Sequence, residues 1–445
     1  MSAQPHRRTT RRQFLSASAG LAGLAASTAL SGHAPRARAP AANDKLDLAV
    51  IGVGGRGRAN LDGVAHENIV AVCDVDARNL AQAARRFPRA KTFADFRRML
   101  DAVGRHVDAV VVSTPDHTHA PAAATALRMG KHCYCEKPLT HSVHECRTLI
   151  ELARKNELVT QMGTQIHAGS NYRRVVEIIR AGRIGTIREV EVWHTVSYTG
   201  RGRPKDTPPV PAHLKWDLWL GPAPARPYHP CYAPGRWRSW WDFGCGGLGD
   251  FGCHYLDLPF WALGLRHPTS VEATGPAVLA ENTPPWLEVR YAFPARGQMP
   301  PVTLTWRDGG RRPKILADVL RPLGPSQAKR WTAGVLFVGA KGMVLADYSR
   351  HVVLPAERFA GVAPPPQTIP PSIGHHREWT EACKTGGPTT CNFDYSGTLA
   401  VAVLLGNVAY RAGEKLAWNA KELKAVHCPK ADRFLRRPYR KGWAL

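Results

Sequence analysis

The stretch from Leu46 to Gly57 reads LDLAVIGVGGRG, an apolar strand pattern that runs directly into a glycine-rich turn. Its glycines contain the spacing G-x-G-x-x-G, which permits a tight turn, close approach of the backbone to a pyrophosphate and close packing of a helix. A strand pattern precedes the turn and a short helix pattern follows it, as in the first unit of a dinucleotide-binding domain. The residues expected to contact a dinucleotide here are Gly52, Gly54, Gly55, Arg56 and Gly57.

An acidic residue closes the next predicted strand, Ile69–Cys73. Asp74 lies 22 residues (74 − 52) after Gly52, where a carboxylate can accept hydrogen bonds from the adenosine ribose hydroxyls. This position favours NAD as the cofactor. Arg56 and Arg58 could instead meet the 2′-phosphate of NADP, which stays as the less favoured alternative.

Strand and helix patterns alternate from Leu46 to Met162, which predicts a parallel sheet with helices on both faces. Ligands of such sheets bind at the carboxyl ends of the strands. A polar loop, Ser113–His119, follows one strand pattern and should lie at that edge. Its residues expected to contact the cofactor are Thr114, Pro115 and His117, and Asp116 either joins them or caps the following helix.

The segment Glu136-Lys137-Pro138 follows another buried strand pattern, His132–Cys135. It should therefore lie at the same edge of the sheet as the glycine turn. Lys137, fixed by the proline that follows it, is a cation directed at the ligand of that turn. We expect Glu136 and Lys137 to contact the cofactor.

The second half of the chain has a different pattern. An extended strand at 186–198 and shorter alternating segments near 271–279, 287–293, 302–306, 335–339 and 352–354 predict a mostly antiparallel sheet. The predicted divisions are a signal peptide (1–41), a Rossmann domain (42–162), an α+β substrate and oligomerisation domain (163–393), a helix packing back on the first domain (394–420) and a basic tail (421–445).

A glycine-rich segment in this second half contains a histidine with two nearby carboxylates. If a helix starts near Asp250, His254 lies one turn later on the same face, and Asp257 can reach that face as well. A histidine positioned by a carboxylate is a suitable general base near neutral pH. A satisfied core histidine is the alternative, and the attached cofactor domain favours catalysis.

Aromatic residues are concentrated just before that histidine. The five tryptophans are Trp216, Trp219, Trp237, Trp240 and Trp241. Flat aromatic faces suit the C–H faces of sugars, although tryptophan is also a large core residue. As a group they favour a carbohydrate site.

Composition excludes several classes of protein. The net charge is +25, but the basic residues outside the two termini form no concentrated run, so we expect no nucleic-acid partner. No Cys/His set has zinc-site spacing, so no metal is expected, and the ten cysteines should be mostly buried free thiols.

The N-terminal region contains a twin-arginine pattern, Thr10–Leu15 (TRRQFL), followed by a mildly apolar stretch to Leu30. That stretch is too weakly apolar for a stable membrane span. We therefore expect export by the twin-arginine pathway, to the periplasm or beyond, and no membrane span in the mature protein.

With these motifs in order, the chain resembles the Gfo/Idh/MocA oxidoreductase family (glucose–fructose oxidoreductase, inositol dehydrogenase, rhizopine catabolism) from Leu46 to about Asn419. The most specific marks are Gly52–Gly57, Glu136-Lys137-Pro138 and Asp250-x-x-x-His254, and the segments at 216–222 and 392–397 look like marks of exported members. The resemblance implies that Lys137 lies near the nicotinamide and the substrate hydroxyl, that His254 is the acid/base and that Asp250 contacts the substrate or the histidine. His167 stands where relatives often place an arginine, which puts any substrate assignment in doubt. Further candidates for substrate contact are Gln165, Tyr172, Trp241 and Asp257.

The expected function is NAD(P)-dependent oxidation or reduction of a secondary hydroxyl of a sugar, polyol or glycoside. An exported enzyme meets little free dinucleotide, so we expect its cofactor to stay bound. The alternative is an NAD-dependent glycoside hydrolase that works by transient oxidation, elimination, hydration and re-reduction. A third class, a non-catalytic binding protein, is disfavoured because Lys137, Asp250 and His254 occur together. The antiparallel sheet offers a face for a homo-oligomer.

Overall fold

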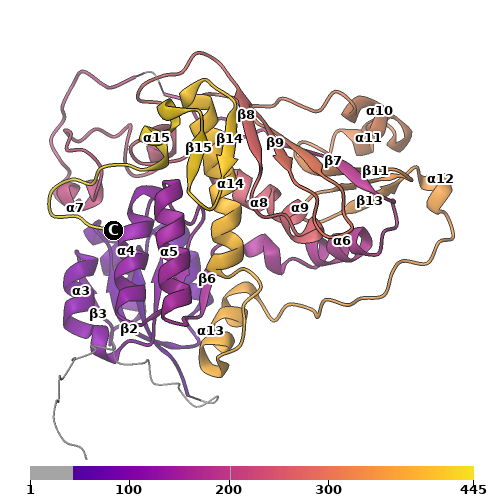
Figure 1. Ribbon diagram of the computed structural model, residues 1–445. Coiled ribbons are helices and arrows are strands. Elements are labelled where there is room, and N and C mark those ends of the chain that lie inside the picture. The colour runs from indigo at the N-terminus through magenta and orange to yellow at the C-terminus, as the bar shows by residue number, and fades with distance from the viewer. Residues whose placement is uncertain (1–43, 201) are drawn as a thin grey trace, which may run out of the picture. The chain divides into compact units, whose positions relative to one another are not determined.

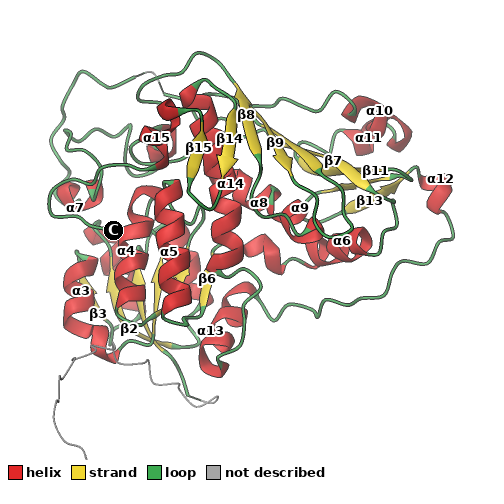
Figure 2. Cartoon of the chain, viewed as in Figure 1, coloured by secondary structure: helices red, strands yellow, loops and turns green. Residues whose placement is uncertain are grey.

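The computed structural model describes residues 44–200 and 202–445, which lie within one compact unit, Arg36–Leu445. Two β-sheets organise the described residues, and helices pack on both (Figure 1, Figure 2). The predicted signal peptide, residues 1–41, lies outside the described residues. Among the helices that the structure describes, none combines the length and apolar character needed to cross a membrane.

The first sheet has six parallel strands in the order β3-β2-β1-β4-β5-β6. They are β1 (Asp47–Ile51), β2 (Asn68–Cys73), β3 (Lys91–Phe93), β4 (Ala109–Val112), β5 (His132–Cys135) and β6 (Thr160–Met162). The connecting helices are α1 (Arg56–Gly63), α2 (Ala77–Arg86), α3 (Phe96–Val103), α4 (Asp116–Arg128) and α5 (Val143–Lys155). Both faces of the sheet are buried, because Ala49 and Ile51 of β1 join one core while Leu48 and Val50 join another. The predicted Rossmann-type domain is therefore confirmed.

The second sheet has nine strands in the order β13-β12-β11-β7-β10-β9-β8-β14-β15. They are β7 (Ile187–Trp193), β8 (Ser270–Thr274), β9 (Glu288–Phe293), β10 (Val302–Arg307), β11 (Gly334–Gly339), β12 (Met343–Ala346), β13 (His351–Leu354), β14 (Leu416–Asn419) and β15 (Lys424–Val426). Neighbouring strands pair antiparallel except β7 and β10, which are parallel. The mostly antiparallel sheet predicted from the sequence is thus confirmed.

A long apolar helix, α14 (Phe393–Ala412), joins the two sheet layers. It packs against α5 and β6 of the first domain and against β8 and α8 (Gly246–Tyr255) of the second. Nearly all of its residues are buried, which explains its uniformly apolar sequence. The helix that carries His254 is therefore held in a fixed position relative to the first sheet.

Three segments differ from the predicted divisions. The helix predicted over 394–420 ends at Ala412, and β14, which follows it, pairs with β8 in the second sheet. The expected basic tail contains β15 and α15 (Pro429–Leu435), which complete the second sheet and its covering layer, and the residues after Leu435 have neither helix nor strand. In addition, α13 (His375–Thr385) packs on the first domain, where Trp379 and Cys383 join the core around Val50. All ten cysteines are free thiols and nine of them are buried, as expected.

Candidate active site

The glycine turn has a backbone that only glycine allows at several positions. Gly52 and Gly55 have positive φ angles of 81° and 50°. A Cβ at Gly54 would lie 2.2 Å from Nδ2 of Asn79, and one at Gly57 would lie 2.0 Å from the carbonyl oxygen of Gly52. The turn therefore leaves an open cradle at the N-terminus of α1, which suits a pyrophosphate. Gly57 packs inside the turn instead of facing the cradle.

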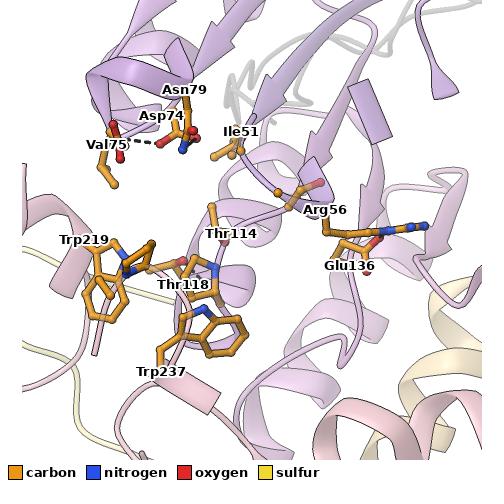
Figure 3. A pocket seen from close by; sticks show the side chains of 18 of the residues that line it. Ile51, Arg56, Asp74, Val75, Asn79, Thr114, Thr118, Glu136, Trp219 and Trp237 are labelled. Carbon is orange, nitrogen blue, oxygen red and sulfur yellow. Dashed lines mark hydrogen bonds and ion pairs between the residues drawn. The ribbon is translucent and has the colours of Figure 1, made fainter. Parts of the chain in front are cut away.

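A cavity of about 760 Å³ extends from this turn along the carboxyl edge of the first sheet (Figure 3). Its volume lies within the range typical of small-molecule and cofactor sites. The predicted site residues that line it are Gly52, Gly54, Gly55, Arg56, Asp74, Thr114, Pro115, Glu136, Lys137, Gln165, Asp250 and His254. The structure thus brings together residues from both halves of the chain.

Asp74 is fixed at the end of β2 by backbone amides. Its carboxylate accepts hydrogen bonds from the N–H of Val53 at 2.9 Å and the N–H of Asp76 at 2.8 Å. Burial raises the pKa of Asp74. Figure 3 shows Arg56 beside Glu136 and away from Asp74, and Arg58 donates to Gln82 on an exposed surface. In this structure the contacts of Arg56 and Arg58 are thus with Glu136 and Gln82 and not with Asp74.

Glu136, at the end of β5, accepts hydrogen bonds from several side chains. Its Oε1 accepts hydrogen bonds from Asn60 at 2.9 Å, Gln165 at 2.7 Å and Arg56 at 3.3 Å. These contacts fix the end of the strand and thereby the direction in which the side chain of Lys137 enters the cavity.

Lys137 and Asp250 form a buried ion pair across the cavity. The ammonium group of Lys137 donates to the main-chain oxygen of Asp250 at 2.9 Å and also pairs with its carboxylate. Tyr198 donates its hydroxyl to that carboxylate at 2.7 Å, and Nε of Arg238 lies 3.1 Å from it. Burial alone would raise the pKa of Asp250, but Lys137 and Arg238 outweigh it and hold the pKa below its usual range. Asp250 is therefore a carboxylate at neutral pH.

His254 lies on the same helix as Asp250, but the carboxylate does not position it. Helix α8 begins at Gly246 and not near Asp250, and the carboxylate is occupied by Lys137, Tyr198 and Arg238. Nδ1 of His254 is buried and has no hydrogen-bond partner among the described residues. Burial, and then the charge of Lys137, lower the pKa of His254 well below its ordinary value. The ring is therefore neutral at neutral pH.

The other predicted partner, Asp257, belongs to a separate buried cluster. Its carboxylate lies 2.9 Å from Nδ1 of His167 and accepts a hydrogen bond from the hydroxyl of Tyr395 at 2.7 Å. The prediction that Asp257 reaches the face of His254 or a substrate is therefore wrong. His167 pairs with Asp257 through Nδ1, while its buried Nε2 has no hydrogen-bond partner among the described residues.

Three more predicted contacts lie away from the cavity. The ring nitrogens of His117 lie within hydrogen-bond distance of the main-chain oxygens of Phe243 and Trp219, and burial lowers the pKa of His117 to about 3. Tyr172 is buried and donates its hydroxyl to the carbonyl oxygen of His254 at 3.1 Å, so it supports the backbone. Trp241 donates to the carbonyl oxygen of Leu279 at 3.1 Å.

Asp116 lines the cavity but does not cap α4, because the cap position is Pro115 and no side chain bonds there. Its carboxylate accepts a hydrogen bond from the N–H of Cys245 at 3.2 Å, and burial raises its pKa to about 6. The helix-cap interpretation is therefore wrong.

The tryptophan cluster is mainly the core of the proline-rich segment 199–245. Trp216, Trp219, Trp237 and Trp240 are buried together with Tyr232 and Phe243. Only Trp219 and Trp237 of the five tryptophans also line the cavity, beside Thr118 (Figure 3). Most of this cluster therefore serves packing and not sugar binding.

Arg238 and Tyr198 were not predicted from the sequence, although both contact Asp250. They come from the segment 199–245 and from the residues after β7, and no local spacing relates them to Asp250.

In comparisons with known proteins, the chain matches two family models, has relatives of similar sequence and shares its fold with solved structures. Residues 46–164 match a model of the Gfo/Idh/MocA oxidoreductase family with an NAD-binding Rossmann fold, and residues 178–299 match the model of its C-terminal α/β domain. An inositol 2-dehydrogenase 1 of Saccharopolyspora erythraea is 34% identical over 172 residues, which are 37% of this chain and 49% of that protein. A glycosyl hydrolase family 109 protein of Shewanella pealeana is 27% identical over 154 residues, 32% of this chain and 34% of that protein. The chain thus spans half or less of the length of these relatives.

Among solved structures, the WlbA dehydrogenase of Bordetella pertussis, in complex with NADH and UDP-GlcNAcA, has a TM-score of 0.59 at 18% identity. The superposition covers 84% of this chain and 99% of that one. At this identity the likeness shows a common fold.

Proposed function

The chain belongs to the Gfo/Idh/MocA family of NAD-binding oxidoreductases, and on that premise we propose that it transfers a hydride between NAD and a secondary hydroxyl carbon of a sugar, polyol or glycoside. The observation that carries the proposal is the convergence of Lys137, Asp250 and His254 on a cavity that begins at the glycine turn. Relatives named as an inositol dehydrogenase and a levoglucosan dehydrogenase support this substrate class.

The bound nicotinamide would supply the hydride acceptor and donor, and the protein would handle the proton. In the oxidising direction the neutral ring of His254 accepts the hydroxyl proton while the carbinol hydride leaves. Lys137 donates a hydrogen bond to the same oxygen as it becomes a carbonyl, and Asp250 holds the ammonium group in place. The proton thus leaves the oxygen and the hydride leaves the carbon, and both are returned when the reaction runs in reverse.

The twin-arginine pattern at Thr10–Leu15 supports a further part of the proposal, that the protein is exported with its cofactor already bound. A retained cofactor must be regenerated within the site, either by a second substrate or within one turnover.

Regeneration within one turnover is the second candidate function, a glycoside hydrolase acting by transient oxidation. The similarity to a glycosyl hydrolase family 109 protein is the observation that favours this candidate. Purified protein incubated with a panel of glycosides and polyols separates the two functions. Net formation of reduced nicotinamide supports the dehydrogenase, whereas release of the aglycone without net absorbance change supports the hydrolase.

Asp74 should determine the preference for NAD over NADP. Replacing Asp74 by Asn removes a charged acceptor for the ribose hydroxyls, so we expect the Kd for NAD to rise about 10-fold or more. The Kd for NADP should fall, because the 2′-phosphate no longer meets a carboxylate. Titration of the cofactor-stripped protein with each dinucleotide measures both constants.

Asp101→Asn, on an exposed part of α3, is the control and should leave both constants unchanged. Equal NAD and NADP affinities in the unmodified protein would contradict the role of Asp74.

A further inference from the structure

The last ten residues, Arg436–Leu445, form an irregular segment that we call the C-terminal strap. In Figure 1 this segment leaves α15, passes α7 (Trp216–Leu220) and ends beside α4. It therefore runs from the second sheet, over the proline-rich segment 199–245, to the helices of the first domain.

The first half of the strap is tied to the start of α5. Nε of Arg437 lies 2.8 Å from Oε1 of Glu145, and the hydroxyl of Tyr439 donates to the same oxygen at 2.6 Å. Arg437 also donates to the main-chain oxygen of His117. Glu145 is nearly fully buried, so these contacts satisfy a charge that is shielded from water.

The second half of the strap joins the segment 199–245 to the first domain. Arg440 pairs with Asp217 of α7, and Nε of Arg440 donates to the carbonyl oxygen of Gly221 at 3.1 Å. On the other side, Arg97 of α3 donates to the carbonyl oxygen of Gly442 at 3.0 Å, and Arg128 of α4 donates to that of Leu445 at 2.8 Å.

Between these anchors, Trp443 forms part of the wall of the cofactor cavity. Its ring centroid lies 5.9 Å from that of Phe96, and the guanidinium of Arg97 lies 4.2 Å above it. Asp95 and Phe96, which follow β3, line the same part of the cavity.

This part of the cavity is the adenosine end. Strand β3 lies next to β2, whose end carries Asp74, the residue placed to bind the adenosine ribose. The segment 199–245 covers the same end, because the N–H of Ala77 donates to the carbonyl oxygen of His213 at 2.8 Å and the N–H of Lys215 donates to that of Val75 at 2.9 Å. Lys137 and His254 lie in the part of the cavity built by β5 and α8.

We propose that the C-terminal strap is a component of the dinucleotide site. Trp443 supplies an aromatic wall for the adenosine half of the cofactor, and the ion pair between Arg440 and Asp217 holds the segment 199–245 closed over it. The cofactor then leaves only when the strap is released. This inference rests on the proposed NAD-dependent function and gives a physical cause for retention of the cofactor outside the cytoplasm.

The test measures how fast NAD leaves the full-length protein. Protein loaded with radiolabelled NAD is passed into cofactor-free buffer containing an excess of unlabelled NAD, and the bound label is followed with time. We expect Trp443→Ala to release NAD about 10-fold faster or more, and Trp443→Phe to release it at an intermediate rate. Arg440→Ala should also accelerate release of NAD, because it removes the ion pair that holds the segment 199–245 over the cavity. This variant leaves the aromatic wall, Trp443, in place.

Trp286→Ala is the matched control. Trp286 is also a partly exposed tryptophan beneath an arginine, with the guanidinium of Arg311 3.4 Å above its ring, but it does not line the cavity. A chain ending at Leu435 should release NAD fastest. If that chain does not fold, the point variants alone test the role of the strap.

The possible outcomes separate the two proposals. If the unmodified protein binds NAD and both Trp443→Ala and Arg440→Ala release it at the unmodified rate, the role of the strap is overturned and the proposed function stands. If the unmodified protein binds no dinucleotide under any condition, both are overturned.

Discussion

Replacing His254 by alanine is expected to lower kcat by about 10²–10⁴-fold, the range for loss of a general acid–base group. The structure places His254 at the cavity with a neutral ring, and two charged groups of the same cavity, Lys137 and Asp250, form an ion pair with each other. Bound NAD should be retained, because the glycine turn and Asp74 are unchanged in this variant. Single-turnover reduction of the bound cofactor by a responsive substrate measures the effect directly.

The control is His351→Ala. His351 is also a half-buried histidine, hydrogen-bonded to Asn171 at 2.7 Å, and it does not line the cavity. A His254→Ala variant with unmodified single-turnover rates on every responsive substrate would rule out His254 as the proton acceptor.

The same histidine predicts the pH dependence of kcat/KM. The active form is neutral, and burial followed by the charge of Lys137 lowers the pKa of His254 well below 6.5. As the pH falls through 6.5, kcat/KM should therefore stay constant, and it should fall only in more acidic solution, where the ring becomes protonated. A decline of kcat/KM centred at the ordinary histidine pKa would show that the ring is not shielded as the structure indicates.

Local chemistry explains which parts of the site could be predicted from the sequence. The glycine turn and Asp74 are close in sequence, and each depends on backbone geometry that one strand–turn–helix unit determines. The edge position of Lys137 follows from its place after a buried strand. For these residues the predicted location agrees with the cavity lining, except that Gly57 packs inside the turn.

The contacts of Asp250 could not be predicted in the same way. Helical spacing correctly placed Asp250 and His254 on one helix, but it cannot show which distant cation competes for the carboxylate. Lys137 is 113 residues away in sequence, and Arg238 comes from an irregular segment whose fold depends on its own tryptophan core. An oppositely charged pair at such separation forms only when the two domains are assembled.

The C-terminal residues show a second reason for failure. Strand β15 has only three residues, Lys424–Val426, and a segment this short has no recognisable alternation. The strap has no helix or strand, so the sequence predicts only a basic tail there. The acidic partners of its basic residues, Glu145 and Asp217, are distant in sequence, and only tertiary contacts reveal that two of these basic charges are structural.

The ion pair between Lys137 and Asp250 should be necessary for both activity and stability. Lys137→Met is expected to lower kcat by about 10²–10³-fold, because the developing carbonyl oxygen loses a hydrogen-bond donor. Asp250→Asn should lower the free energy of unfolding by about 3 kcal/mol, because it leaves the buried ammonium group without its counter-charge. Kinetics of the bound cofactor and chemical denaturation at neutral pH measure the two effects.

The pH dependence gives this prediction a defined sign. Asp250 has a lower pKa in the folded protein than in the unfolded chain, so its ionisation stabilises the fold above the unfolded value, about 3.9, and that stabilisation is lost as the pH falls through the folded value. The difference in unfolding free energy between the unmodified protein and Asp250→Asn should therefore be constant near neutral pH and shrink in acid. The double variant Lys137→Met/Asp250→Asn should lose less unfolding free energy than the sum of the losses in the two single variants. The reason is that the double variant removes both charges and so leaves no buried charge without its partner. Strictly additive losses would show that the two groups act independently, and Lys137 would then need another partner to hold it against the substrate oxygen.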